Sequence, residues 1–311
     1  MTDDDALILR EAWHHGEAWR HPAVCDAHQR AWLRRVRAWV DSGEQTSAVQ
    51  RWGRQVGKSW SGIAFDLCEM QRRPGIIVRY AALTAKSCAA IVVPTFEALA
   101  ATMPRSILPK LNEQKGTIAS PNGSTFVFAG TDNEQFDRLR GPRSHIIDLD
   151  ESAFYADLVS VENALVPQLQ TTRGIVIYRS SPPETPAHPF TQRDAAAQSA
   201  GRWSKATLHD NPRLGPEGVA RIAAAEATRL GLTLEQLFAS SYWRREYLAE
   251  MVTEEGRAAL PAWTDEAQSA LVGDWLVLRP GSGVGPTRAL RPRLGGRPLP
   301  AAGGQPRRCT G

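Results

Sequence analysis

Cysteine is scarce in this chain of 311 residues, which has only Cys25, Cys68, Cys88 and Cys309. The four lie far apart, with no CxxC pair and no histidine at ligand spacing, which argues against a disulfide framework or a cysteine metal site. A charged start followed by a long apolar run is also absent, so the sequence predicts neither a signal peptide nor a membrane span. We therefore expect a cytoplasmic protein that makes no membrane contact.

The overall charge is +4 and the sequence pI is about 9.0, but most of the chain carries no net positive charge. Seven arginines and no acid lie from Arg279 to Gly311, which leaves the rest of the chain near −3. Bulk charge is therefore weak evidence for nucleic-acid binding. The same final segment is rich in glycine and proline and has no hydrophobic period, which predicts an unstructured end. Two interpretations remain open for it: a disordered polycationic arm, or a translated frameshift.

What the sequence does contain is a phosphate-binding pattern at residues 51–60 (RWGRQVGKSW). A loop ending in Gly57, Lys58 and Ser59 supplies free backbone N–H groups, a flexible cation and a hydroxyl for Mg²⁺. The glycine that usually opens such a loop is displaced, because Trp52 stands at its position and Gly53 follows one residue later. The flanking patterns support the interpretation, since residues 46–52 predict a strand and residues 61–70 a helix.

An acidic strand end at residues 145–152 (HIIDLDES) complements this loop. Ile146, Ile147 and Leu149 predict a buried strand, which would deliver Asp150 to the metal and Glu151 to the water that attacks the γ-phosphate. Either segment alone is weak evidence. Together they predict ATP hydrolysis.

The remaining patterns alternate between strands and helices. We expect helices at 6–19 and 26–39, a strand at 75–83, a helix at 84–103 that is interrupted or ended near Pro94, and a hairpin at 116–130. A helix at 157–169 and a strand at 174–178 follow the acidic strand, and two helices, 214–230 and 234–251, are separated near Gly231. Such alternation predicts an α/β fold with a mainly parallel sheet covered on both faces.

Four places in order make residues 26–257 resemble the large terminase subunit of tailed bacteriophages and prophages, the motor that packages DNA into a procapsid. They are the shortened phosphate loop 53–59 (GRQVGKS), the hairpin 121–124 (PNGS) followed by 139–141 (LRG), the strand end 178–183 (YRSSPP), and 243–250 (WRREYLAE). The resemblance implies a P-loop NTPase fold of the ASCE type with a small helical lid. On this basis we expect an ATPase core at 1–205, the lid at 206–260, and a linker with the unstructured tail at 261–311.

The resemblance also implies ATP and Mg²⁺ as cofactors and gives roles to single residues. Lys58 would neutralise the phosphates, Ser59 and Asp150 would hold Mg²⁺, and Glu151 would orient or deprotonate the attacking water. Gln29 matches a glutamine that reads adenine in similar proteins, or is an ordinary surface glutamine. Arg54 would sense the γ-phosphate, or form a structural salt bridge. The other nucleotide contacts predicted from the loop are Gln55, Val56, Gly57 and Trp60.

Two further roles follow from the resemblance. Arg140 matches an arginine finger that reaches the ATP of a neighbouring subunit, with Arg138 and Arg143 as competitors for that role. Ser180 and Ser181 match a coupling motif that passes hydrolysis on to the DNA-gripping region, or form an ordinary strand-ending turn.

The implied partners are double-stranded DNA, a portal protein, a small terminase subunit and further copies of the chain in a ring. Full-length relatives continue into a nuclease domain of the ribonuclease H type, but after Trp263 the only acids are Asp265, Glu266 and Asp274, so we expect no nuclease activity. Two alternatives stay open: an inactive truncated prophage remnant that only binds nucleotide, and a helicase-like DNA-dependent ATPase. A metabolic kinase is disfavoured, because the Asp-Glu pair favours water as the nucleophile.

Overall fold

An eight-stranded sheet organises residues 2–252, the part of the chain that the computed structural model describes, apart from the side chains of residues 133–135. The strand order is β3-β4-β5-β2-β6-β7-β1-β8. Six strands form the parallel part: β1 (Thr46–Trp52), β2 (Ile77–Ala82), β5 (Thr125–Gly130), β6 (Ile146–Asp150), β7 (Ile175–Ser180) and β8 (Trp203–Ala206). The antiparallel strands β3 (Lys110–Asn112) and β4 (Thr117–Ala119) extend one edge.

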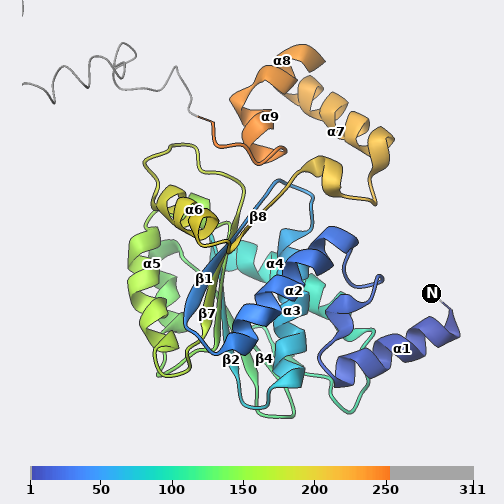
Figure 1. The fold of residues 1–311 in the computed structure, drawn as a ribbon, viewed down its shortest axis with the longest axis vertical. Helices are drawn as coiled ribbons and strands as arrows, with labels where there is room; N and C mark the ends of the chain where they lie inside the picture. Colours follow the sequence, from blue (N-terminus) through green and yellow to red (C-terminus); the bar gives the residue numbers. More distant parts are fainter. Residues whose placement is uncertain (1, 253–311) are drawn as a thin grey trace, which may run out of the picture. The chain divides into compact units, whose positions relative to one another are not determined.

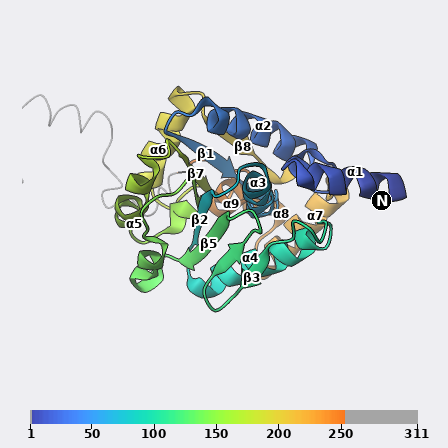
Figure 2. The ribbon, with the colours of Figure 1, turned by 90° about the horizontal axis from the view of Figure 1, so that it is seen from below.

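Helices cover both faces of this sheet (Figures 1 and 2). The helices α2 (Ala27–Ser42), α3 (Lys58–Arg72) and α4 (Ala85–Ala100) lie on one face, where α1 (Asp3–His14) packs against α3. The helices α5 (Leu158–Leu165) and α6 (Pro189–Ser199) lie on the other face. Because side chains alternate along a strand, β6 gives Ile146 to the core under α3 and Ile147 and Leu149 to the core under α5.

The order of the strands determines where the two sequence motifs meet. β1, which precedes the phosphate loop, and β6, which ends in Asp150, are separated by β7, and all three run parallel. Their carboxyl ends therefore lie side by side at one edge of the sheet. The mainly parallel sheet with helices on both faces confirms the predicted α/β fold class.

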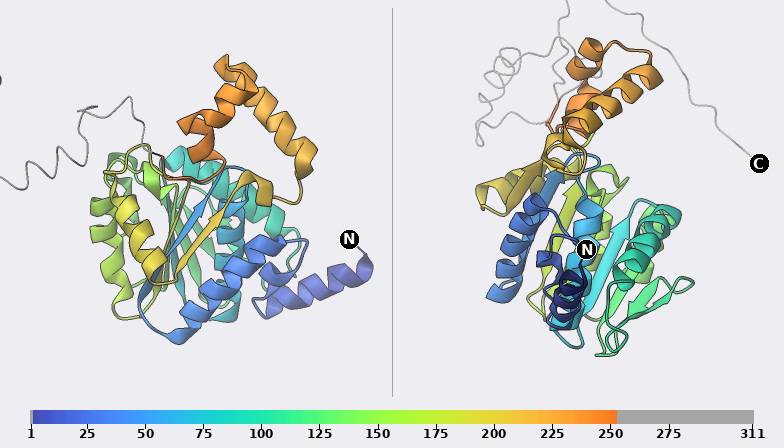
Figure 3. Two further views of the ribbon diagram at one scale, coloured as in Figure 1. Left: turned by 45° about the horizontal axis from the view of Figure 1, so that its top comes forward. Right: turned by 90° about the vertical axis from the view of Figure 1, so that its right-hand side faces the viewer.

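Within residues 207–252, three α-helices follow β8: α7 (Gly215–Leu230), α8 (Leu234–Ala239) and α9 (Ser241–Glu246) (Figure 3). They enclose a third hydrophobic cluster of their own, centred on the stacked rings of Trp243 and Tyr247 and completed by Leu208, Ala223, Ala227 and Leu237. Gly231 ends α7 with a φ of 67°, as the sequence predicted.

Two expectations about helices are wrong. The single helix expected at 234–251 is broken at Ser240, because the Ser240 hydroxyl accepts a hydrogen bond from Trp243 N at 3.1 Å and so begins a new helix, α9. In contrast, α4 is neither interrupted nor ended near Pro94. Pro94 and Ala90 are both exposed, so water can reach the carbonyl group that the proline leaves without a donor.

Smaller differences concern ends and additions. The first helix spans Asp3–His14, and a separate 3-10 turn at Ala18–Arg20 follows it. The strand β1 has the predicted bounds, whereas α6, β3 and β8 were not predicted. No helix among residues 2–252 is long and apolar enough to cross a bilayer. The predictions for the tail at 261–311, including the missing nuclease acids, lie outside the described residues.

Candidate nucleotide site

The phosphate loop leaves β1 at Trp52 and enters α3 at Lys58. Backbone bonds fix its start, since Gly53 N donates to Ala206 O at 2.9 Å and Arg54 N donates to Glu246 O at 2.6 Å. Gln55 and Gly57 have left-handed backbones, with φ of 58° and 77°, which turn the loop into the helix. The N–H groups of the first turn of α3 are then free to bind an anion.

Lys58 and Glu151 form an ion pair at the mouth of this loop. Lys58 Nζ lies 2.8 Å from Glu151 Oε1, and the lysine side chain is only 7% exposed. Burial acts to lower the pKa of Lys58, but the nearby Glu151 and Asp150 carboxylates outweigh it, so the pKa is raised. Lys58 is therefore a fixed positive charge where the phosphates of a nucleotide would lie.

Asp150 ends β6 and is fully buried beside the same loop. Tyr80 donates a hydrogen bond to Asp150 Oδ2 at 2.6 Å, while Oδ1 has no hydrogen-bond partner among the described residues. Burial and the charge of Glu151 raise the pKa of Asp150 to about 6, against the lowering effect of Lys58 and of the Ser59 and Tyr80 hydroxyls. A buried carboxylate oxygen without a donor, next to a hydroxyl, fits the oxygen ligands that Mg²⁺ prefers, so Asp150 and Ser59 suit the predicted metal role.

Glu151 follows the strand in a left-handed conformation, with a φ of 54°. Its carboxylate, 27% exposed, pairs with Lys58. Ser180, at the end of β7, donates to Glu151 Oε2 at 3.4 Å and accepts from Ala153 N at 3.2 Å. The first predicted coupling residue thus contacts the predicted catalytic carboxylate.

The second coupling residue, Ser181, contacts a different carboxylate. Its hydroxyl donates to Glu246 Oε2 at 3.1 Å, and the same oxygen accepts from Arg54 Nε at 2.7 Å. Glu246 belongs to α9 and is 2% exposed. Glu246 therefore connects the phosphate loop, the end of β7 and the three-helix cluster. Its salt bridge with Arg54 is the structural alternative that the sequence left open for that arginine.

Gln29 lies beneath the loop and is 3% exposed. Its amide nitrogen donates to Val56 O and Gly57 O, both at 3.2 Å, and its oxygen accepts from Asp26 N at 2.7 Å. It is therefore no surface residue. A cavity of about 270 Å³ opens beside it, lined by Asp26, Gln29, Gln55, Val56, Gly57, Trp60, Asn211 and Arg213.

Arg140 does not lie at the nucleotide site of its own chain. It follows the 3-10 helix Asp132–Leu139, and the next residue, Gly141, lies against Arg79 and Gln168 near the start of β6. Asp150 and Glu151 stand at the other end of that strand. The Arg140 side chain is 59% exposed and pairs with Asp137 at 2.6 Å, and Arg138 and Arg143 are exposed as well.

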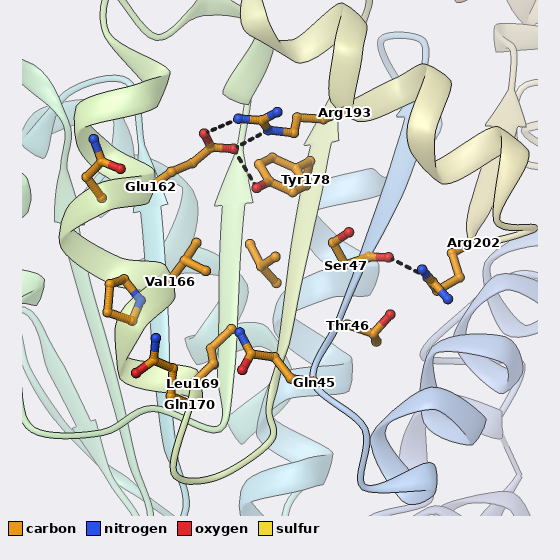
Figure 4. A pocket seen from close by; sticks show the side chains of 13 residues that line it. Gln45, Thr46, Ser47, Glu162, Val166, Leu169, Gln170, Tyr178, Arg193 and Arg202 are labelled. Carbon is orange, nitrogen blue, oxygen red and sulfur yellow. Dashed lines mark hydrogen bonds and ion pairs between the residues drawn. The ribbon is translucent and has the colours of Figure 1, made fainter.

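A separate cavity of about 550 Å³ lies between α5 and α6 over the starts of β1 and β7 (Figure 4). Glu162 lines it and accepts hydrogen bonds from the Tyr178 hydroxyl and from Nε and Nη2 of Arg193. None of the predicted site residues lines this cavity.

Three contributors to the nucleotide site were missed in the sequence: Tyr80, Glu246 and Asn211, whose amide donates to Gln55 O at 2.6 Å. The only signal for Tyr80 was a hydroxyl inside an apolar strand. Glu246 and Asn211 act on the loop from more than 150 positions away, as their hydrogen bonds record. Glu246 lies in the segment 243–250 that carries the resemblance, but nothing in that segment indicates a contact with the phosphate loop, and no local pattern marks Asn211.

A phosphate loop and an acidic strand end on either side of an added parallel strand define a P-loop NTPase. The family model described as "Terminase large subunit, T4likevirus-type, N-terminal" matches residues 52–258, two thirds of the chain. The chain therefore belongs to the large terminase family. A search among curated proteins found no match.

Solved structures agree with this at the level of the fold. The large terminase of a thermophilic bacteriophage is 14% identical with a TM-score of 0.57, over 73% of this chain and 53% of that chain. The large terminase of bacteriophage HK97 is 15% identical with a TM-score of 0.56, over 72% of this chain and 50% of that chain. The protein of the thermophilic phage has also been solved in complex with ADP, at 14% identity and a TM-score of 0.55, over 71% of this chain and 53% of that chain. This chain therefore spans about half the length of these terminases.

Proposed function

We propose that this chain hydrolyses ATP with Mg²⁺ as cofactor and uses the energy to move double-stranded viral DNA into a procapsid. The observation that carries the proposal is the meeting of Lys58, Asp150 and Glu151 at the carboxyl ends of β1 and β6. Phosphoryl transfer to water requires a cation for the phosphates, a carboxylate that can bind the metal and a carboxylate that can accept a proton from water. Lys58, Asp150 and Glu151 are suited to these three tasks.

In the proposed reaction, the phosphates of ATP lie on the N–H groups at the start of α3, and Lys58 leaves Glu151 to bind them. Glu151 is then free to accept a proton from the attacking water. Ser180 holds the other oxygen of Glu151 and so fixes its orientation. Mg²⁺, held by Asp150 and Ser59, would neutralise charge that develops on the phosphates.

Coupling to movement is proposed to run through Glu246. Arg54 is held by this carboxylate, so Arg54 has to release Glu246 in order to bind the γ-phosphate. Such a release would loosen the link from the loop to Ser181 and α9 in one step. We propose that the region predicted as a lid at 206–260 changes position on this signal, while residues 1–205 act as the ATPase core.

The family and the exposed position of Arg140 support an assembled form of the enzyme. We propose a ring of copies in the host cytoplasm, docked on a portal protein and supplied with DNA by a small terminase subunit. Arg140 would then stabilise the charge at the site of a neighbouring copy, because it lies at the far end of β6 from its own Glu151.

The test is ATP hydrolysis by the full chain, with and without double-stranded DNA and over a range of protein concentrations. The motor predicts turnover that rises with DNA and with protein concentration, that is lost in Lys58→Met, and that is kept in Lys86→Met, an exposed lysine on α4. Nucleotide binding without turnover would identify an inactive remnant. Separation of a tailed DNA duplex would identify the helicase-like alternative.

A further inference from the structure

Four polar side chains meet in the interior beneath the nucleotide site, in a place that the proposed chemistry does not use. Arg179 of β7 donates from Nε to both oxygens of Asp148 of β6, each at 2.7 Å, and from Nη1 to Gln50 of β1. Asp66 of α3 lies over them. All four side chains are fully buried, so water does not screen their charges.

The hydrogen bonding within this cluster is unbalanced. One guanidinium faces two carboxyl groups, and both hydrogen bonds that it donates to a carboxylate go to Asp148. Neither oxygen of Asp66 accepts a hydrogen bond from a described donor, and the group that it meets is the other carboxyl, Asp148. Two ionised carboxylates would leave one buried charge without a partner, which is strongly unfavourable. A proton on Asp66, donated to Asp148, removes the excess charge and gives the two carboxyl groups a hydrogen bond to each other, while Nη2 of Arg179 and Nε2 of Gln50 have no described acceptor.

The surroundings of Asp66 favour a proton there. Burial raises its pKa well above the usual range, and the charge of Asp148 adds to this effect, against the lowering effect of Arg179. The remaining charged group that faces it is Glu69, which is itself held by Arg37, Arg72 and Arg73.

Three members of the cluster, Asp66, Asp148 and Arg179, stand on the elements that carry residues of the nucleotide site. Asp148 precedes Asp150 by two positions on the same face of β6, and Arg179 directly precedes Ser180. On α3, Asp66 lies two turns after Lys58, with Gly62 between them at helical spacing. A Cβ atom at Gly62 would lie 2.6 Å from Arg179 Nε and 3.0 Å from Asp148 Oδ2, so α3 approaches the cluster more closely than a side chain at this position would permit.

We propose that Asp66, Asp148 and Arg179 form a buried positioning unit, in which Asp66 carries a proton and Asp148 carries the charge that opposes Arg179. The unit fixes α3, β6 and β7 relative to one another, and thereby fixes Lys58, Asp150 and Ser180, which these elements carry. Its effect on turnover rests on the proposed ATPase function, whereas its protonation does not.

The test compares Asp66→Asn with Asp66→Leu in the full chain. The Asn side chain is neutral and can still donate a hydrogen bond to Asp148, so kcat should stay within about twofold of the parent. The Leu side chain has no donor, so kcat should fall by about 10- to 100-fold with little change in KM. Equal losses in both variants, or no loss in Leu, would overturn the positioning role.

The protonation is tested without ATP. A group whose pKa is higher in the folded than in the unfolded protein stabilises the fold fully below the unfolded pKa of 3.8, and this contribution is lost as the pH rises toward the folded pKa. The parent should therefore lose Tm with rising pH above about 4 more steeply than Asp66→Asn. Parallel curves would show that Asp66 is ionised in the fold and would overturn the assignment. If the parent itself has no turnover, the proposed function fails while this comparison still decides the protonation.

Discussion

Lys58 Nζ lies 2.8 Å from Glu151 Oε1, so the cation and the carboxylate assigned to ATP hydrolysis are paired with each other. The pair bridges the two sequence motifs, one from the start of α3 and one from the end of β6. In the proposed mechanism, a nucleotide competes for Lys58 and so frees Glu151 for the attacking water.

Replacement of Glu246 tests the link between the phosphate loop and α9. Glu246→Gln keeps the shape but removes the charge that holds Arg54 and accepts from Ser181. We expect faster hydrogen exchange in residues 241–247 and a fall in kcat of about tenfold, because the loop loses its anchor.

The matched control is Glu250→Gln. Glu250 forms a similar salt bridge with Arg244 at 2.7 Å near the same helix, without contact to the loop. An equal effect in the two variants would show that the loss comes from general loosening of the helices.

The pH dependence of Mg²⁺-nucleotide binding tests the role of Asp150. Its pKa of about 6 in the free protein means that it takes up a proton below that pH, and a protonated carboxyl is a poor metal ligand. Affinity should fall by about tenfold per pH unit below about 6. The stability of the free protein should change in the opposite direction, since the raised folded pKa costs stability as the pH rises from 3.8 to about 6.

Tyr80→Phe checks this assignment. The Tyr80 hydroxyl lowers the pKa of Asp150, so its removal should move the loss of affinity to higher pH. Titration of binding by fluorescence at each pH measures the shift. If the pH at which affinity falls were the same in Tyr80→Phe and the parent, a group other than Asp150 would control metal binding.

Arg140→Ala tests the action of one copy on the next. The side chain is 59% exposed and its pair with Asp137 is on the surface, so the change should cost less than about 1 kcal/mol of stability. Slow hydrolysis at low protein concentration should persist, while the increase with concentration is lost. Arg138→Ala and Arg143→Ala serve as controls, and loss of the increase in either of them would move the role to that residue.

The sequence predicted the parts of the site that are continuous in the chain. The strand 46–52, the loop 53–59 and the strand end at Asp150 and Glu151 were found because each motif carries its own spacing and its own run of apolar residues. Ser180 was singled out only through the resemblance, as part of a coupling motif or of an ordinary strand-ending turn, and its contact with Glu151 was not predicted. A strand end of small hydroxyl residues has no unique local meaning.

The parts that escaped prediction depend on distant partners or on competing local bonds. The break at Ser240 results from one hydroxyl that caps α9, which an apolar period cannot reveal. Glu246 gains its role from Arg54, 192 positions earlier in the chain. Asp66 and Arg179 are charged residues within apolar stretches of the sequence, and both are fully buried in the fold. A buried charged side chain requires a partner, but the sequence does not show which residue that partner is.

The most direct measurement of the central claim is single-turnover ATP hydrolysis by Glu151→Gln. The variant keeps the size of the side chain and removes the base, so we expect the hydrolysis rate to fall by at least about 100-fold. ATP should bind at least as tightly as in the parent, because Lys58 loses its competing partner. Glu113→Gln, an exposed acid in the loop between β3 and β4, is the control and should match the parent. Hydrolysis in Glu151→Gln at the parental rate would contradict the account.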